Sequence, residues 1–341
     1  MIEGGSQKNI ITFENVVNKP SRAVADGQEM TATDLDKFFV YGYYTKTGLT
    51  ANAIQIFDGT EVNKGTDGWT YEGTRFWVPG ATYQFYAYSC GDLKLSNAFG
   101  SFSMDGSLDT DAKRALKITN YMCDNTHQHD LLYATSDKIV AKGAGETNSR
   151  VAFKFEHLLT RVYATFITEF PEEYSVDIKN VKITNIFNEG DFDPFAVPQW
   201  NGLLIKRTGG NDPYVNLTNN GQVLTATTSA PAVSNGVFVI PNNYTSGDAN
   251  GTVYIEFSIE VRKGNDVVFS TPMSGSWAPV WNKGYRYNYN IKLTAAEAGL
   301  EAIMFTVAED EFGKFIDGST PELTIQVPGA TLPDTGENTG E

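Results

Sequence analysis

The chain has 341 residues, and its 26 Lys and Arg against 41 Asp and Glu give a net charge of −15. This acidic balance excludes a protein that binds nucleic acid through the phosphate backbone, because that mode of binding needs a basic surface. Hydrophobic residues make up 41% and charged residues 20% of the chain, so it can bury a sizeable core and is not disordered by composition.

The first half of the chain begins with an alternating segment, IITFENV at residues 10–16, which predicts a strand with one buried face. A polar stretch from Asn18 to Asp34 separates this strand from the core. The core begins at residues 38–44, FFVYGYY, which are apolar on both faces, as in a strand inside a sandwich. Further strands are predicted at residues 82–89 and 151–155.

The second half continues with predicted strands at residues 161–167, 181–186, 236–240, 253–261 and 285–293. The last two alternate most regularly, as VYIEFSIEV and YRYNYNIKL. Clusters of Gly, Asn, Asp and Pro between the strands are typical of turns. Only DTDAKRAL near Asp111 and TAAEAGLEA near Ala296 resemble helices. The sequence therefore predicts an all-β sandwich or barrel architecture.

A division of the chain is predicted near residue 170, where Phe170-Pro171 follows a strand. This gives an N-terminal β domain at residues 1–170, a C-terminal β domain at 171–327 and a flexible polar tail at 328–341. Five aromatic residues on the predicted inner faces are expected in the core: Phe153, Phe155, Tyr285, Tyr287 and Tyr289.

The two cysteines, Cys90 and Cys123, are too few for a disulfide-stapled scaffold or a structural zinc site. Two alternatives stay open from the sequence. The cysteines form one disulfide bridge if the compartment is oxidising, or they are two buried thiols.

No residues are predicted to be catalytic or to bind a metal, and no cofactor is predicted. The segment His127-Gln128-His129-Asp130 brings imidazoles and a carboxylate together, but a solvated loop is the favoured interpretation. Asn188, Glu189, Asp191 and Asp193 are oxygen-rich, yet they lack the spacing of a calcium-binding loop and are interpreted as an acidic turn. Motifs of nucleophilic, zinc-dependent and nucleotide-dependent enzymes are missing.

Several motifs together resemble the fimbrillin-like family, the pilins of type V pili of anaerobic Gram-negative bacteria. The most specific are Asp130-Leu131-Leu132-Tyr133-Ala134 and the segment from Val151 to Val162, VAFKFEHLLTRV. The others are Ile11-Thr12-Phe13, Ser21-Arg22-Ala23, Trp77-Val78-Pro79-Gly80 with the strand after it, Ile240-Pro241, and Lys283 to Tyr289. Within the signature, His157 is expected to be buried and bonded to a neighbouring carbonyl, and Arg161 to pair with a carboxylate.

The resemblance implies two transthyretin-like β-sandwich domains in tandem and a non-catalytic, structural or adhesive pilus subunit. It implies partners that are other pilin subunits, in a homo- or heteropolymer, and a host glycan or protein as receptor. It also implies export as a lipoprotein precursor and a location at the cell surface, anchored in the outer membrane or within a fimbrium.

The residues themselves are compatible with assembly by strand exchange. Removal of the strand at residues 10–16, with Ile11 and Phe13, would expose an apolar groove and unpaired backbone groups, which recruit another strand. Leu323, Ile325 and Val327 alternate with polar residues and form a candidate donor strand. Arg22, in a segment with Pro20 and small neighbours, is the predicted site of proteolytic maturation.

The alternative is a secreted protein that binds or cleaves carbohydrate with a β-sandwich. In this interpretation Trp69, Trp77 and Trp200 are exposed and form stacking platforms for sugar rings. The two hypotheses differ in what they place on the surface: an apolar groove with a removable strand, or a row of exposed aromatic rings.

Overall fold

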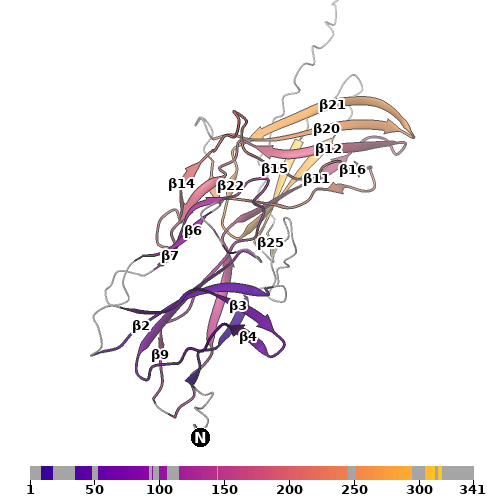
Figure 1. Cartoon of the computed structure of the whole chain (residues 1–341). Helices are drawn as coiled ribbons and strands as arrows, with labels where there is room; N and C mark the ends of the chain where they lie inside the picture. The colour runs from indigo at the N-terminus through magenta and orange to yellow at the C-terminus, as the bar shows by residue number, and fades with distance from the viewer. Residues whose placement is uncertain are drawn as a thin grey trace, which may run out of the picture.

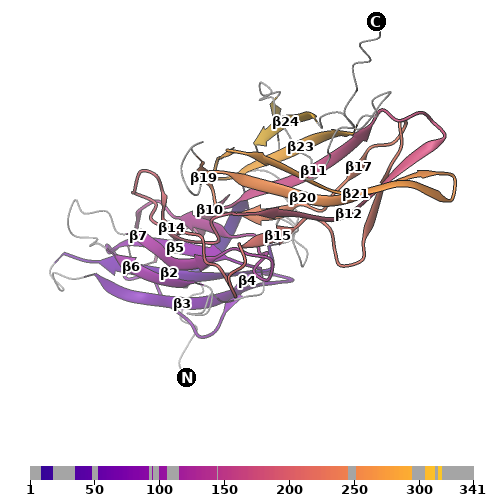
Figure 2. The same ribbon diagram turned by 90° about the horizontal axis from the view of Figure 1, so that it is seen from above.

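The computed structural model describes residues 9–17, 35–47, 53–91, 94, 100–105, 115–143, 145–244, 251–293, 304–311 and 314–316. Every named element within these residues is a β-strand, which confirms the all-β prediction. The strands form two lobes that lie end to end (Figures 1 and 2). Among the described residues, no helix has the length and hydrophobicity to cross a lipid bilayer. The two segments that resemble helices lie almost wholly outside the described residues.

The N-terminal lobe contains an eight-stranded sheet, called here the N-terminal sheet. Its order is β1 (Phe13–Val17), β10 (Val151–His157), β8 (Leu132–Thr135), β5 (Thr82–Ser89), β2 (Lys37–Thr45), β3 (Ile54–Gly65) and β4 (Gly68–Tyr71), with β9 (Ile139–Val140) paired to β5. A four-stranded sheet, called here the bridging sheet, has the order β14 (Trp200–Leu204), β13 (Glu189–Phe192), β7 (Ala115–Met122) and β6 (Ser101–Asp105).

The C-terminal lobe is formed by two larger sheets and one short pair. One sheet has the order β17 (Ala232–Val233), β11 (Thr160–Thr168), β23 (Tyr285–Leu293), β24 (Met304–Glu311) and β25 (Lys314–Ile316), with β18 (Val237–Val239) paired to β11. The other has the order β15 (Tyr214–Asn216), β12 (Tyr174–Thr184), β20 (Val253–Lys263) and β21 (Asp266–Trp277), with β16 (Val223–Ala226) paired to β12. Strands β19 (Asn242–Asn243) and β22 (Val280–Trp281) pair with each other.

The N-terminal sheet has a core on each face, which explains why β2 and β5 are apolar on both sides. Phe38 and Val40 of β2 pack into a cluster with Phe153 and Phe155 of β10. Phe39, between them, belongs instead to a second cluster that includes residues of the bridging sheet. The prediction that FFVYGYY lies inside layered structure is confirmed, because the sheet is covered on both faces.

The inner faces of the two large C-terminal sheets meet in a third core. Alternating residues of β20 and β23 supply much of it, among them Phe257, Ile259 and Tyr289. Four of the five aromatic residues expected in the core are buried: Phe153, Phe155, Tyr287 and Tyr289. Tyr285, at the start of β23, is only partly buried against the same core.

Strand pairing differs from the predicted division at residue 170. Strand β11 lies before that residue but pairs in parallel with β23 of the C-terminal lobe, from Arg161↔Arg286 to Thr168↔Leu293. Strands β13 and β14 lie after it but join β7 in the bridging sheet. The Pro171–Tyr174 turn therefore connects two strands of the same lobe, and the chain passes between the lobes more than once.

Truncation of Phe155, which is 3% exposed, tests the core of the N-terminal sheet. We expect Phe155→Ala to lower the free energy of unfolding by about 3–5 kcal/mol through lost burial and a residual cavity. Val268→Ala is the matched control, because Val268 is 54% exposed on β21 and should change stability by less than about 0.5 kcal/mol. Denaturant unfolding of both variants is the measurement. Equal free energies of unfolding for the two variants would show that Phe155 does not face the core.

Candidate functional site in the groove of the N-terminal strand

Strand β1 closes the open edge of the N-terminal sheet. It pairs in parallel with β10, from Phe13↔Val151 to Val17↔Phe155, and the Val151 N–H donates to the Thr12 carbonyl at 2.8 Å. The residues just before it pair in the opposite direction with the segment that follows β4. There the Ile11 N–H donates to the Arg75 carbonyl and the Trp77 N–H to the Asn9 carbonyl, both at 2.8 Å.

The side chains of this segment alternate as the sequence predicts. Ile11 is 0% and Phe13 is 1% exposed, whereas Glu14 lies on the surface. The segment therefore fills a groove with its apolar side chains and bonds both groove edges with its backbone. The chain after Val17, which would lead to the core, lies outside the described residues up to residue 34.

A cage of aromatic rings surrounds Phe13. Its ring centroid lies 5.3 Å from that of Phe57, with the planes at 70°. Four more rings lie within 5.7–6.0 Å of it, from Phe38, Tyr71, Phe85 and Phe153. The ring of Phe153 is stacked on that of Phe13 and the others are edge-to-face, and aromatic pairs of both kinds contribute about 0.5–1.5 kcal/mol each beyond the buried area. Phe13 is therefore the main anchor of the segment.

Two polar side chains hold the rim of the groove. Burial raises the pKa of the Tyr71 phenol, so it stays protonated and donates to the Ile11 carbonyl at 2.7 Å. The Arg75 guanidinium lies 4.6 Å from the centre of the Phe57 ring and donates to the Ile56 carbonyl at 2.7 Å. These contacts fix the segment after β4 against which Ile11 pairs.

The sequence predicted Ile11 and Phe13 at this site but missed the wall that faces them. Tyr71 and Arg75 belong to the β3–β4 hairpin and the segment after it. The turn residues Thr66 and Asp67, flanked by Gly65 and Gly68, are the signal in the sequence that predicts such a hairpin. The predicted maturation site Arg22 and the predicted donor residues Leu323, Ile325 and Val327 lie outside the described residues.

Replacing Phe13 should loosen the strand without removing the groove. We expect Phe13→Ala to speed hydrogen exchange of the β10 amides that face β1, such as Val151, because the aromatic anchor is lost. Glu14→Ala changes the neighbouring exposed residue and should leave exchange unchanged. Hydrogen exchange followed by mass spectrometry or NMR is the measurement. An unaltered rate of hydrogen exchange at Val151 in Phe13→Ala would contradict the anchoring role of Phe13.

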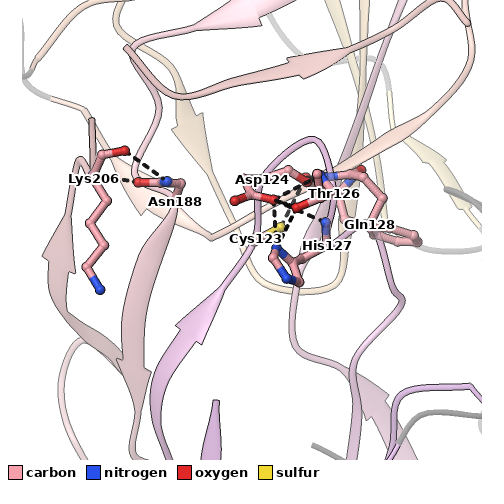
Figure 3. Close-up of polar contacts among 8 residues, drawn as sticks. Cys123, Asp124, Thr126, His127, Gln128, Asn188 and Lys206 are labelled. Atoms are coloured by element: carbon pink, nitrogen blue, oxygen red, sulfur yellow. Dashed lines mark hydrogen bonds and ion pairs between the residues drawn. The ribbon is translucent and has the colours of Figure 1, made fainter. Parts of the chain in front are cut away.

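In the histidine-rich loop, Thr126 and His127 are hydrogen-bonded to Asp124. Asp124 Oδ1 accepts from the Thr126 N–H at 2.9 Å, the Thr126 hydroxyl at 2.8 Å and the His127 N–H at 3.1 Å, and it contacts His127 Nδ1 at 2.7 Å (Figure 3). Burial opposes ionisation of Asp124, but the bonds from Thr126 and His127 outweigh it and lower the pKa of the carboxyl. The loop is thus a closed turn around one carboxylate.

Other candidate ligands also have partners. His157 Nδ1 lies 2.9 Å from Oδ1 of the buried Asp130, so its partner is a carboxylate and not the carbonyl that was predicted. Glu189 pairs with Lys206, and Asp193 with Lys117 at 2.8 Å. The backbone of Lys206 donates to Asn188 Oδ1 at 2.7 Å (Figure 3). Within the described residues, no group of three or more His, Cys, Asp or Glu side chains could hold a metal ion.

The tryptophans do not form the platform expected of a carbohydrate-binding sandwich. Trp77 and Trp200 are each 3% exposed, and Trp69 is partly buried against Phe38. The Trp200 indole N–H donates to the Leu158 carbonyl at 2.8 Å, so this residue joins the bridging sheet to the end of β10. The prediction of exposed rings is wrong, because the second core covers Trp200 and the first covers Trp77.

Both cysteines are buried, free thiols in the structure. Burial raises the pKa of Cys90 to about 12 and raises that of Cys123 well above its usual range. The Cys123 Sγ lies 3.2 Å from the Phe238 carbonyl, to which it donates. Of the two alternatives from the sequence, the structure has the buried thiols.

A thiol titration tests this state. Because the thiolate is the reactive form, neither cysteine should react with a disulfide reagent in the folded protein at mildly alkaline pH. In concentrated guanidinium chloride without reductant, both cysteines should react with this reagent. Failure of either to react after unfolding would show that they are bridged.

The chain is similar in sequence to one known protein family. The sequence model of the family described as fimbrillin-like matches residues 21–309. A search of curated protein sequences finds no match.

Solved structures are also similar to the chain. One is a candidate cell adhesion protein from Bacteroides uniformis, with 15% identity and a TM-score of 0.47, covering 90% of this chain and 99% of that one. Another, from Bacteroides eggerthii, has 11% identity and a TM-score of 0.45, covering 88% and 95%. The fimbrial anchor protein Mfa2 from Porphyromonas gingivalis has 12% identity and a TM-score of 0.33, covering 91% and 98%.

Proposed function

Since the chain belongs to the fimbrillin-like family, we propose that it is a structural or adhesive subunit of a cell-surface pilus that assembles by β-strand exchange. The observation that carries this proposal is the groove of β1. A short terminal segment holds both edges of an open sheet and places Phe13 in a cage of five rings.

Exchange starts with loss of the covalent tether. In the sheet, β1 lies beside β10 and not beside β2, the next strand in the sequence. The segment from residue 18 to 34 connects β1 covalently to the core. Cleavage after Arg22 leaves β1 held by non-covalent contacts alone. Its departure would expose the ring cage and the unpaired edge of β10, which a strand from another subunit then fills.

The donor strand in this proposal is the segment with Leu323, Ile325 and Val327. Its alternate apolar residues match the alternate pattern of Ile11 and Phe13, which the groove buries. The partners are other pilin subunits of the same or another type, and a host glycan or protein serves as receptor. The subunit reaches the cell surface as a lipoprotein precursor and stays in a fimbrium or at the outer membrane.

The subunit is proposed to be non-catalytic and to need no cofactor. Two of the histidines are bonded to neighbouring carboxylates, His157 to Asp130 and His127 to Asp124. The alternative, a secreted protein that binds or cleaves carbohydrate on tryptophan platforms, loses its main support because Trp77 and Trp200 are buried.

Limited proteolysis tests the activation step. We expect trypsin to cut the folded protein after Arg22, and β1 to be displaced when a synthetic peptide spanning residues 320–330 is added, because the tether no longer keeps β1 at high effective concentration. N-terminal sequencing locates the cut and size-exclusion chromatography follows assembly. Arg22→Gln is the matched control and should remain uncut at this site and monomeric.

Two results would contradict the proposal. One is resistance of Arg22 to cleavage in the folded protein. The other is a cut protein that keeps β1 bound in the presence of the peptide and stays monomeric.

A further inference from the structure

A polar cavity of about 750 Å³ lies where the two lobes meet. One wall is the loop with Asn125 and Thr126, which follows β7 of the bridging sheet. Another wall is formed by Asn216 at the end of β15 of the C-terminal lobe, by Asn219 and Asn220 after that strand, and by Asn235 between β17 and β18. Its volume is within the usual range for small-molecule sites in proteins.

Hydrogen bonds between the lobes fix the two walls relative to each other. Gln128 Oε1 accepts from the Phe238 N–H at 2.7 Å, and its Nε2 donates to the Phe238 carbonyl at 3.1 Å. Asn125 Oδ1 accepts from the Asn216 N–H at 3.0 Å. The Asp124 turn of Figure 3 holds this loop from the other side. The cavity is therefore formed before any ligand arrives.

The cavity offers amide groups that the protein does not use. Within the described part of the chain, the side chains of Asn216, Asn219 and Asn220 have no hydrogen bond to protein, although they line the cavity. Asn235 uses its Nδ2 on Gln222 and keeps its Oδ1 for another donor. Each amide provides a donor and an acceptor side by side, which is the pattern that neighbouring hydroxyl groups require.

The charge of the lining narrows the ligand class. No Asp or Glu is among the described residues that line the cavity, although the chain has 41 of them. Arg161 lines it and lies directly over Gly236, where a Cβ atom would come within 2.2 Å of its Nε. His129 is the single His, Cys, Asp or Glu among the described lining residues, which is too few for a metal cation, and a polar lining does not suit an apolar ligand. A polyhydroxylated ligand fits both conditions.

We propose that this cavity binds an oligosaccharide through its asparagine side chains. No Phe, Tyr or Trp is among the described lining residues, so the sugar lacks the large stacking face that these rings give and a single site binds weakly. The inference deepens the adhesive role and rests on the proposed function in one respect. A polymer of subunits would present many such sites, and multivalency would raise the overall avidity.

A glycan array tests the site on the uncut, full-length monomer. The probes are printed oligosaccharides of neutral, fucosylated and sialylated types, and the protein is clustered by an antibody against an added tag. We expect retention on a subset of glycans. The double variant Asn219→Ala with Asn220→Ala should weaken binding to those glycans by about tenfold, because two amide partners are lost.

Asn63→Ala is the matched control, because Asn63 is on β3, outside the residues that line the cavity, and this variant should bind as the unaltered protein does. Thermal unfolding of each variant verifies that the fold is kept. Absence of retention on every glycan, or equal retention by the double variant, overturns the site. The assay does not need assembly, so a failure of strand exchange leaves this result intact, and failure here leaves the groove proposal intact.

Discussion

The N-terminal lobe depends on one constraint: the edge of β10, which would be unpaired without β1, has to be covered. A sheet edge with an apolar face beside it must be covered, because exposed backbone groups and rings invite pairing with another chain. Here the cover is a short segment that bonds β10 on one side and the residues after β4 on the other. Phe13 then completes a core of rings that otherwise has an opening.

The second core joins this lobe to the next one. It contains Phe192 and Trp200 of the bridging sheet together with Leu158, which follows β10, Phe238 of β18 and Ile240 just after β18. Strand β10 is followed by β11 after only Leu158 and Leu159, and the Gly284 N–H donates to the Leu159 carbonyl at 3.0 Å. The chain crosses this junction repeatedly, and the apolar residues of the second core come from both lobes.

The local pattern located the most regular strands, but it missed β3 and β7 and did not predict how distant strands meet. Alternation located residues 253–261 and 285–293, because each period-two run depends only on its own residues. The parallel pairing of β11 with β23 and the placement of β13 beside β7 depend on topology that no short window contains. For the same reason the sequence left open the alternative in which Trp200 is exposed, and it predicted a carbonyl as the partner of His157. At the groove, Phe13 was identified by alternation, whereas Tyr71 and Arg75 face it only after the sheet curves.

In the strand exchange that we propose, the energetics of the groove would let one subunit be stable alone and still release its strand. Ile11 and Phe13 together contribute about 3–6 kcal/mol of burial, a large part of the roughly 5–15 kcal/mol that stabilises a typical domain. While the tether is intact, β1 rebinds at high effective concentration, and a strand from another chain cannot compete. After a cut, the same contacts must hold β1 against dilution, so every dissociation becomes an opening for a donor. The stability of the monomer and its capacity to assemble would then arise from the same residues, with the covalent link deciding between them.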